Sequence, residues 1–265
     1  ANGHKNCWIV FNGEIYNYQD IRQQLIARGY QFSTDSDTEV ILSAYEEWGE
    51  DCVHQLRGMF AFAIYDLRSD KRGRLFIARD RVGKKPLFYT VVDGHFIFGS
   101  EIKAILAHPT VPRIVNRQVV PLYLAYGFFP APFTIFEGIY ELPPGHYLAV
   151  QNGEVEVNEY WDIRYPHEPD VLGDEGEIIA EVRRLLENAV RIRLMSDVPL
   201  GAFLSGGLDS TAIVSYMTRH MNQRVKTFAI GFEDDPTFNE LEYARLVARE
   251  YRTDHHEFIV RPNAI

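Results

Sequence analysis

The sequence predicts two folds in succession, an α+β domain of layered sheets and helices and then an α/β domain on a parallel sheet. The first expectation rests on strands such as 59–66, which are apolar at nearly every position and therefore covered on both faces. The second rests on strands that alternate with helices after residue 198, which implies right-handed crossovers between parallel strands. A polar stretch with Pro, Gly and acidic residues separates the two.

We place the first domain at residues 1–164, a linker at 165–177 and the second domain at 178–265. In the first domain, Asn17 and Gly29 bracket an expected helix over 18–28, and the polar turn 34–37 caps a second helix that ends near Gly49. Strands are expected over 7–11, 59–66 and 75–78, hairpins around 93–94 and 152–153, and helices over 101–107 and 119–126.

In the second domain, a long amphipathic helix is expected over 177–194. A buried strand over 198–202 and a helix from residue 208 follow it. The pattern then continues with a strand over 225–232, a helix over 240–251 and a strand over 256–260. These elements predict a three-stranded parallel sheet.

Net charge, apolar content and cysteine spacing exclude several classes of protein function for this chain. The formal net charge of −10 over 265 residues argues against a general nucleic-acid binder. We expect no membrane association, because no apolar run could span a bilayer, and a cytoplasmic location, because the start is polar and carries no secretory signal. Cys7 and Cys52 have no metal-ligand spacing, and we expect both to be reduced, structural residues.

A Ser-Gly-Gly turn joins a strand to a helix at Ser205-Gly206-Gly207-Leu208-Asp209-Ser210. The first N–H groups of a helix lack internal partners, two glycines let the backbone approach a ligand, and Ser205 and Ser210 add hydroxyl groups. This combination favours a phosphate site, and acidic Asp209 suits one if Mg²⁺ lies between them. A Walker A loop would need a Lys after its last Gly, which is absent here, and the alternative is an ordinary tight turn.

A second candidate site lies near the start of the chain. Asn12 and Gly13 follow the expected strand 7–11, and an Asn amide with a Gly backbone N–H can form an oxyanion hole. Asp37, at the start of a helix, could accept an ammonium group. The alternative for each residue is a capped turn.

The SGGxDS pattern resembles the loop of PP-loop ATP pyrophosphatases, which cleave ATP between its α and β phosphates and leave an adenylated substrate. The rest of the chain resembles the class II, Ntn-type glutamine amidotransferase domain of glutamine-hydrolysing asparagine synthetases. The matching segments, which follow one another in the order of that family, are 11–17, 36–39, 58–63, 79–87, 99–104 and 196–201. The resemblance therefore covers essentially the whole chain and implies an αββα glutaminase domain before a Rossmann-like PP-loop domain.

The resemblance also implies residue roles. Asn12 and Gly13 correspond to the oxyanion hole, Glu14 to a glutamine-binding position, and Asp37 to the acid that holds the glutamine α-amino group. In the second domain the implied ATP-binding positions are Leu204 and Ile230 for adenine, Ser205, Gly206, Gly207 and Ser210 for pyrophosphate, and Asp209 for Mg²⁺.

The chain also departs from this family. The family nucleophile is an N-terminal Cys, whereas residue 1 here is Ala, and the family's upstream Arg is missing too. The aspartate-binding elements would lie beyond Ile265. We therefore expect a chain truncated at both ends that does not hydrolyse glutamine or complete synthesis by itself.

The resemblance implies a parent enzyme that amidates aspartate through an adenylated intermediate, with glutamine, aspartate and ATP as substrates and Mg²⁺ as cofactor. It also allows a homodimer. Two alternatives stay open: a related amidotransferase acting on another carboxylate, for example in cell-surface polysaccharide assembly, and an ATP-binding protein that has lost catalysis.

Overall fold

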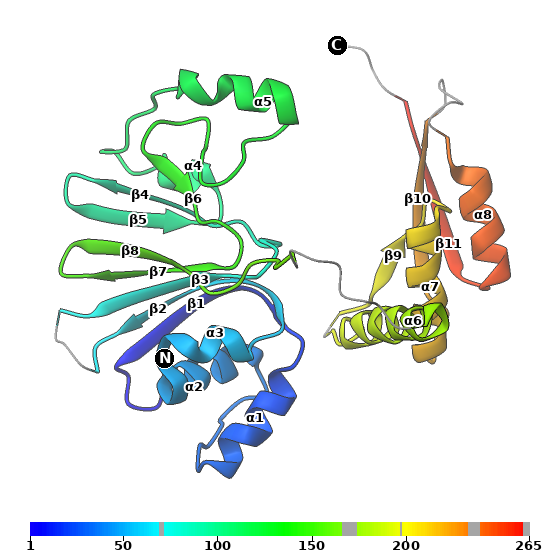
Figure 1. The fold of residues 1–265 in the computed structure, drawn as a ribbon, viewed down its shortest axis with the longest axis horizontal. Helices are drawn as coiled ribbons and strands as arrows, with labels where there is room; N and C mark the ends of the chain where they lie inside the picture. The colour runs from blue at the N-terminus through cyan, green and yellow to red at the C-terminus, as the bar shows by residue number, and fades with distance from the viewer. Residues whose placement is uncertain (69–71, 166–173, 197, 233–238, 262–265) are drawn as a thin grey trace. The chain divides into compact units, whose positions relative to one another are not determined.

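The computed structural model describes residues 1–68, 72–165, 174–196, 198–232 and 239–261. The chain divides into two compact units, Ala1–Tyr165 and Pro166–Ile265 (Figure 1). Most of the linker expected at 165–177 lies outside the described residues.

The first unit contains two antiparallel sheets. The larger has the order β1-β2-β3-β7-β8 and the smaller the order β5-β4-β6. The strands of the larger sheet are β1 (Cys7–Ile15), β2 (Gly58–Asp66), β3 (Arg74–Arg79), β7 (His146–Gln151) and β8 (Glu154–Glu159). Those of the smaller sheet are β4 (Phe88–Val92), β5 (His95–Gly99) and β6 (Ile139–Glu141).

Both predicted hairpins are confirmed. Asp93 and Gly94 join β4 to β5, and Asn152 and Gly153 join β7 to β8. All four residues have positive φ, which is the backbone signature of the tight turns that match the twist of paired strands.

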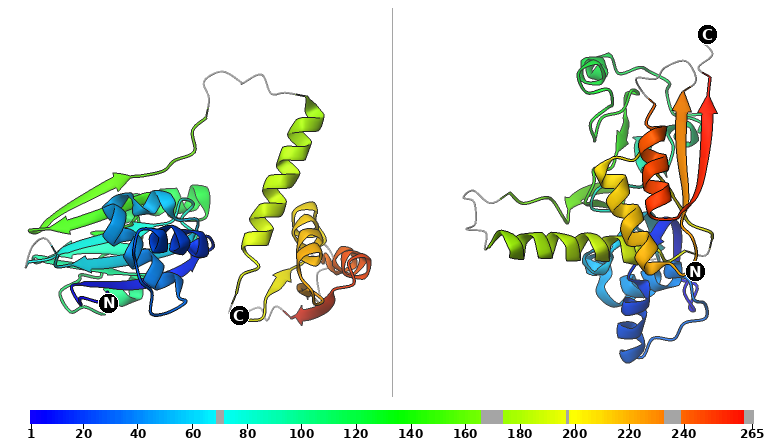
Figure 2. Two further views of the ribbon diagram at one scale, coloured as in Figure 1. Left: turned by 90° about the horizontal axis from the view of Figure 1, so that it is seen from below. Right: turned by 90° about the vertical axis from the view of Figure 1, so that its right-hand side faces the viewer.

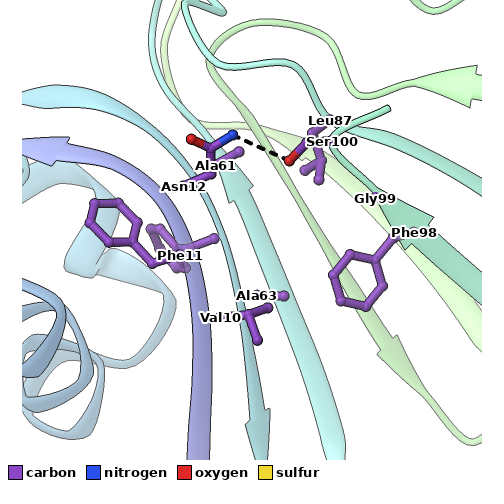
Figure 3. Close-up of a pocket in the computed structure, with 10 residues that line it drawn as sticks. Val10, Phe11, Asn12, Ala61, Ala63, Leu87, Phe98, Gly99 and Ser100 are labelled. Carbon is purple, nitrogen blue, oxygen red and sulfur yellow. Dashed lines mark hydrogen bonds between the residues drawn. The ribbon is translucent and has the colours of Figure 1, made fainter. Parts of the chain in front are cut away.

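The two sheets pack face to face through the small side chains of β2. Ala61 and Ala63 are buried against residues that belong to the same cluster: Ile77, Leu87, Leu142 and Leu148. Partly buried Tyr89, Phe96 and Phe98 from the smaller sheet pack against this cluster. A cavity opens beside the alanines, with Phe98 of β5 on its far side (Figure 3).

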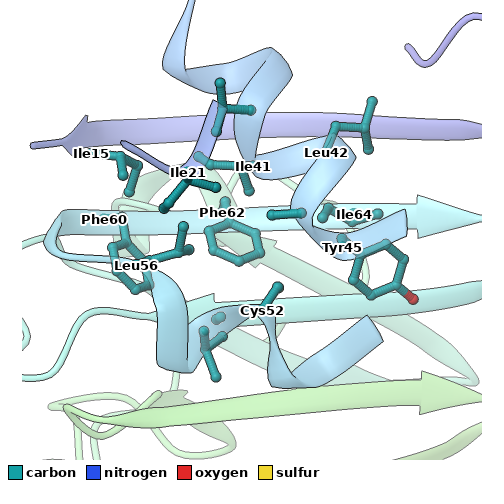
Figure 4. Packing of buried hydrophobic residues seen from close by; sticks show 14 of the residues in the cluster. Ile15, Ile21, Ile41, Leu42, Tyr45, Cys52, Leu56, Phe60, Phe62 and Ile64 are labelled. Carbon is teal, nitrogen blue, oxygen red and sulfur yellow. The ribbon is translucent and has the colours of Figure 1, made fainter. Parts of the chain in front are cut away.

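The other face of β2 carries its large side chains. Phe60, Phe62 and Ile64 alternate with the alanines and are almost fully buried. They pack against helices α1 (Tyr18–Ala27), α2 (Asp37–Trp48) and α3 (Cys52–Gln55), as Figure 4 shows. Burial of each of these three side chains contributes about 1.5–3 kcal/mol to the stability of the folded state. The prediction that 59–66 is covered on both faces is confirmed.

Shorter helices complete the first unit. The expected helix 101–107 is reduced to α4 (Ile102–Ile105), and Ile105 of α4 packs with Val111 and Ile139 beside the smaller sheet. The expected helix 119–126 begins as a 3₁₀ turn and continues as α5 (Val120–Tyr126), which ends at Gly127 in the left-handed conformation.

The second unit is built on a three-stranded sheet of order β11-β10-β9 in which both strand pairs are parallel, as predicted. Its elements are α6 (Glu175–Ile192), β9 (Gly201–Phe203), α7 (Leu208–His220), β10 (Lys226–Phe232), α8 (Leu241–Glu250) and β11 (Asp254–Val260). Figure 2 shows β10 and β11 running in the same direction beside α8. Buried Val214 of α7, Ala229 of β10 and Ala244 of α8 share one core cluster.

Two strand predictions were wrong. The buried strand expected over 198–202 is instead the three-residue β9, in which Gly201 and Phe203 are exposed. The strand expected to end at Phe11 continues to Ile15, because every residue of β1 finds a partner along β2. Asn12 and Gly13 therefore lie within a strand rather than after one.

Among the described residues, no helix combines the length and the apolar character that crossing a membrane requires. Cys7 and Cys52 are buried free thiols, as expected for structural residues. Burial, and then the hydrogen bond that Cys7 Sγ donates to Asp66 Oδ1 at 3.2 Å, raises the pKa of Cys7 to about 12. Burial also raises the pKa of Cys52.

A buried carboxylate organises the end of β3. Asp80 is fully buried, and its carboxylate accepts hydrogen bonds of 2.9–3.2 Å from the backbone N–H groups of Phe60, Val82, Lys84 and Lys85. Such charge-assisted bonds satisfy the carboxylate without a counter-ion. Asp80 thereby fixes the loop 80–85 to the neighbouring strand β2.

The adjacent Arg79 also binds the loop 80–85, through carbonyl groups of its backbone. Its guanidinium donates to the carbonyl oxygens of Lys85, Gly83 and Leu142, and it lies 2.8 Å from Glu141. Because Leu142 and Glu141 lie at the end of β6, Arg79 connects the two sheets.

Replacing Asp80 with alanine should lower the free energy of unfolding of the first unit by about 3 kcal/mol, since it leaves buried N–H groups without acceptors. Urea denaturation followed by tryptophan fluorescence measures this, because all three tryptophans (Trp8, Trp48 and Trp161) lie in this unit. The control Glu156→Ala, on exposed strand β8, should change it by less than about 0.5 kcal/mol. Equal effects of both variants would contradict the assigned role of Asp80.

Candidate functional site

Asn12, Gly13 and Glu14 lie on β1, the edge strand of the larger sheet. In the register with β2, Asn12 is opposite Ala61, Gly13 opposite Phe60 and Glu14 opposite Met59. On an edge strand only one side of the backbone is paired, so alternate N–H groups point away from the sheet.

The hydrogen bonds of Phe60 show which way Gly13 points. The Phe60 N–H donates to Asp80 Oδ2 at 3.1 Å and its carbonyl accepts from the Asp80 N–H at 2.8 Å. Both polar groups of Phe60 are therefore turned away from β1. Gly13 and Phe60 form a non-hydrogen-bonded pair, and the Gly13 N–H points to the open edge of β1.

Asp37 lies on this same edge. The Ile15 N–H, two residues further along β1, donates to Asp37 Oδ2 at 3.1 Å. Residues two apart on a strand are about 7 Å apart and share one side of it. The structure therefore brings the Gly13 N–H and the Asp37 carboxylate to the same edge of β1.

Local hydrogen bonds fix Asp37 at the start of α2. Ser36 caps the helix, and its hydroxyl accepts a hydrogen bond from the Thr38 N–H at 3.1 Å. Glu39 accepts the N–H groups of Ser33 and Thr34 at 2.9 and 2.7 Å. Although burial opposes it, these bonds lower the pKa of Glu39. The turn that carries Asp37 is thus held by hydrogen bonds to Ser36 and to Glu39.

Position 13 has no room for a side chain. A Cβ at Gly13 would lie 2.1 Å from the carbonyl oxygen of Met59 and 2.7 Å from the Phe60 Cα. Both contacts are with backbone of β2, which cannot move without disrupting the sheet. Glycine is therefore the residue that allows β1 to pair here.

Asn12 faces the space between the two sheets. It lines a cavity of about 220 Å³, and its Nδ2 donates to Ser100 Oγ at 3.3 Å (Figure 3). Gly13, Glu14 and Asp37 do not line this cavity. Sequence reasoning did not single out Ser100 as a site residue, although it belongs to the matching segment 99–104.

Hydrogen bonds within the Ser-Gly-Gly turn of the second unit hold Ser205 next to Ser210. Ser205 Oγ lies 3.1 Å from Ser210 Oγ and accepts a hydrogen bond from the Gly207 N–H at 3.2 Å. Helix α7 starts at Leu208 directly after the turn, with Asp209 in its first turn. Gly207 occupies the cap position and gives no side-chain capping bond, so the helix N-terminus is open toward a ligand.

Gly206 brings this turn into contact with α8. Its φ is +83°, and a Cβ there would lie 2.4 Å from both the carbonyl carbon and the Cβ of Tyr243. Glycine is needed for the left-handed backbone and also for the close approach.

A cavity of about 170 Å³ lies beside the turn. It joins three of the predicted ATP-binding residues, Leu204, Ser205 and Ile230, from the carboxyl ends of β9 and β10. Sequence reasoning missed its other lining residues, Phe203, Phe228, Ala229 and Glu240. Phe203 is the last residue of β9, and that position was the signal available for it, whereas Phe228 lies within β10 and enters the cavity by pairing with Phe203.

Asp209 is chemically suited to Mg²⁺. The described residues contain no group of three or more His, Cys, Asp or Glu side chains that could enclose a metal ion. Mg²⁺ bound with a nucleotide needs only one or two carboxylates, because phosphate oxygens and water supply its other ligands. A single acid at the start of α7 fits that requirement.

Two family models match the chain, a glutamine amidotransferase domain over residues 1–161 and an asparagine synthase over residues 181–265. The first covers more than half of the sequence. The chain therefore belongs to the glutamine amidotransferase domain family, and an asparagine synthase segment follows that domain.

The chain matches curated relatives that are named glutamine-hydrolysing asparagine synthetases, and also one that is named an amidase. The chain is 40% identical over 95% of its length to "Asparagine synthetase [glutamine-hydrolyzing] 3" of Bacillus subtilis, and covers 42% of that protein. It is 39% identical over 94% of its length to "Putative asparagine synthetase [glutamine-hydrolyzing] 2" of Methanocaldococcus jannaschii, and covers 47% of it. "Amidase chyE" of Penicillium rubens is 35% identical over 93% of the chain, which covers 38% of that relative. The chain thus spans less than half the length of these relatives.

Among solved structures, the chain is similar to a glutamine phosphoribosylpyrophosphate amidotransferase from B. subtilis, complexed with ADP and GMP. The TM-score is 0.42 at 16% identity, and the match covers 97% of this chain and 46% of that one.

Gly206→Ala should destabilise the second unit by about 3 kcal/mol, because strain at positive φ adds to the contact with α8. Gly153→Ala is a matched control: its φ is +84°, but no atom lies within 4 Å of the added Cβ, so it should cost only about 1 kcal/mol. Hydrogen exchange of α8 and of the β7–β8 hairpin measures the two local stabilities. If the two substitutions lowered local stability equally, the close contact with Tyr243 would contribute nothing to the destabilisation by Gly206→Ala.

Proposed function

We propose that the chain is part of a glutamine-dependent asparagine synthetase, in which ammonia from glutamine amidates aspartate at the expense of ATP. One observation carries the proposal: a glutamine amidotransferase match and an asparagine synthase match follow each other in one chain. We assign residues 1–164 to an Ntn-type αββα glutaminase domain, 165–177 to a linker and 178–265 to the start of a Rossmann-like PP-loop domain.

The edge of β1 supports a glutamine site. Asp37 would hold the α-ammonium group, and Glu14 would contact the same substrate. The Gly13 N–H and the Asn12 Nδ2 would donate hydrogen bonds to the oxyanion that forms when the side-chain amide is attacked. The support for this is the shared edge of Gly13 and Asp37 and the donor position of Asn12.

Neither cysteine of the chain is assigned as the nucleophile. Both are buried, and the pKa of each thiol is raised, so the thiolate that attacks an amide would be scarce near neutral pH. The residues described here would therefore bind glutamine and stabilise the oxyanion, while the attacking thiol comes from elsewhere.

The loop 205–210 would bind ATP. Ser205, Gly206, Gly207 and Ser210 would hold the pyrophosphate portion at the open start of α7, and the main chain of Leu204 and Ile230 would meet adenine. Mg²⁺ held near Asp209 would offset phosphate charge. The aspartate carboxylate would attack the α-phosphorus and release pyrophosphate. Ammonia would then displace AMP from the acyl adenylate and give asparagine.

A different carboxylate acceptor is the second candidate function. The observation that keeps it open is a relative, 35% identical to this chain, whose name gives an activity other than asparagine synthesis. A cytoplasmic location and a homodimer stay predictions.

The test uses the protein as its native cell makes it, supplied with ATP, aspartate and either glutamine or ammonium. We expect AMP and asparagine in equal amounts with both nitrogen donors. Asp37→Asn should abolish the reaction with glutamine and leave that with ammonium intact, because it removes the charge that holds the α-ammonium group. AMP formation that depends on another carboxylate instead of aspartate would support the second candidate.

Asp35→Asn is the matched control. Asp35 lies two residues away and is exposed, where it pairs with Arg22, so this variant should keep both activities. Loss of the ammonium-dependent activity in Asp37→Asn would contradict a role confined to glutamine binding.

A further inference from the structure

Four arginines line one cavity of about 400 Å³ in the second unit. They are Arg224, Arg245, Arg249 and Arg252, and Ala248, Thr253 and His255 complete the lining. Arg224 precedes β10, Arg249 lies in the last turn of α8, and Thr253 precedes β11. The cavity is therefore at the amino ends of the parallel strands, opposite to the loop 205–210.

Three of these arginines have no counter-ion among the described residues. Arg245 is satisfied, because its guanidinium binds both carboxylate oxygens of Glu257 at 2.8 and 2.7 Å. Arg224, Arg249 and Arg252 make no ion pair within the described part of the chain. The C-terminus of a helix favours a nearby cation, which accounts for arginines on α8 but not for Arg224. A positive excess at one place is unusual in a chain of net charge −10.

Arg252 has a left-handed backbone conformation, which is strained for a residue other than glycine. The Thr253 N–H donates to the Ala248 carbonyl and the Arg252 N–H donates to the Arg249 carbonyl. These two bonds form a Schellman motif, in which the residue at the position of Arg252 adopts the left-handed conformation. Glycine is usual there, but this chain has Arg252 with a φ of +52°. Arg252 thus occupies a position where glycine would be less strained, and it lines the cavity.

The buried hydroxyl of Thr227 contacts two of the side chains that line the cavity, Thr253 and His255. Thr227 is fully buried, and its hydroxyl lies 2.8 Å from Thr253 Oγ1 and 2.9 Å from His255 Nδ1. This contact orients the imidazole of His255. Its other nitrogen, Nε2, is buried without a hydrogen-bond partner among the described residues, and Glu257 Oε1 lies 3.3 Å from it. The imidazole is therefore held between Thr227 and Glu257, with the ring among the residues that line the cavity.

From this arrangement we propose that the cavity binds a phosphate-bearing small molecule, at a site separate from the nucleotide loop. Three guanidinium groups without counter-ions match the double charge and several oxygens of a phosphoryl group better than a single carboxylate. The volume falls within the range of small-molecule sites. The cavity and the loop 205–210 are at opposite ends of the same sheet, so the bound molecule would occupy a site separate from the nucleotide.

Isothermal titration of the chain with inorganic phosphate at low ionic strength tests the proposal. Arg249→Gln combined with Arg252→Gly should weaken binding at least tenfold. Arg183→Gln, an exposed arginine on α6, is the control and should leave binding unchanged. Unchanged phosphate affinity in the double variant would overturn the proposal.

Arg252→Gly alone separates binding from folding. Glycine relieves the left-handed strain, so the melting temperature should stay the same or rise while phosphate binding weakens. A fall in the melting temperature together with unchanged phosphate binding would show that Arg252 has a purely structural role and would overturn the proposal.

Two further measurements locate the ligand and its chemistry. The ¹⁵N resonances of the His255 ring should shift when phosphate is added, and should still shift in Ser210→Ala, whose change lies in the nucleotide loop. Loss of all phosphate binding in Ser210→Ala would place the anion at the loop and overturn the proposal. Acetate, a single carboxylate, should bind more weakly than phosphate, and tighter binding of acetate would overturn the phosphoryl assignment.

Discussion

The first unit depends on the buried carboxylate of Asp80. It accepts four backbone N–H groups, and one of them belongs to Phe60, whose carbonyl also receives the Asp80 N–H. With both polar groups of Phe60 engaged there, Gly13 opposite it on β1 has to direct its N–H outward. A buried acid at the end of β3 thus determines where the edge strand presents a hydrogen-bond donor. The outward direction of the Gly13 amide follows from this constraint, and the Ile15 N–H on the same edge of β1 binds the Asp37 carboxylate, which the start of α2 positions.

The second unit uses a parallel sheet in which each end of the strands carries a different set of groups. At the carboxyl ends, Gly206 lets the loop press against α8 and leaves the start of α7 open. At the amino ends, arginines from α8 and its neighbouring turns surround a cavity. Helix α8 contacts both regions, Tyr243 near its start and Arg249 near its end.

Much of the fold could be predicted from the sequence because its signals are local. The two hairpins follow from Asp93-Gly94 and Asn152-Gly153, and the parallel sheet follows from the alternation of elements. The end of β1 could not be predicted, since Asn12-Gly13 is typical of a turn and only pairing with β2 keeps it extended. The cluster around Asp80 and the arginine cavity were also missed, because both assemble from groups on separate segments that no local pattern connects.

The most direct test of the account is a ¹H–¹⁵N spectrum of the chain labelled at glycine, recorded while glutamine is added. We expect the Gly13 amide resonance to move with saturable dependence on the glutamine concentration, while that of Gly153, in the β7–β8 hairpin turn, stays in place. The amide points to the edge where Asp37 is fixed, so a bound substrate has to change its surroundings. A Gly13 resonance that stays unmoved at saturating glutamine would contradict the account.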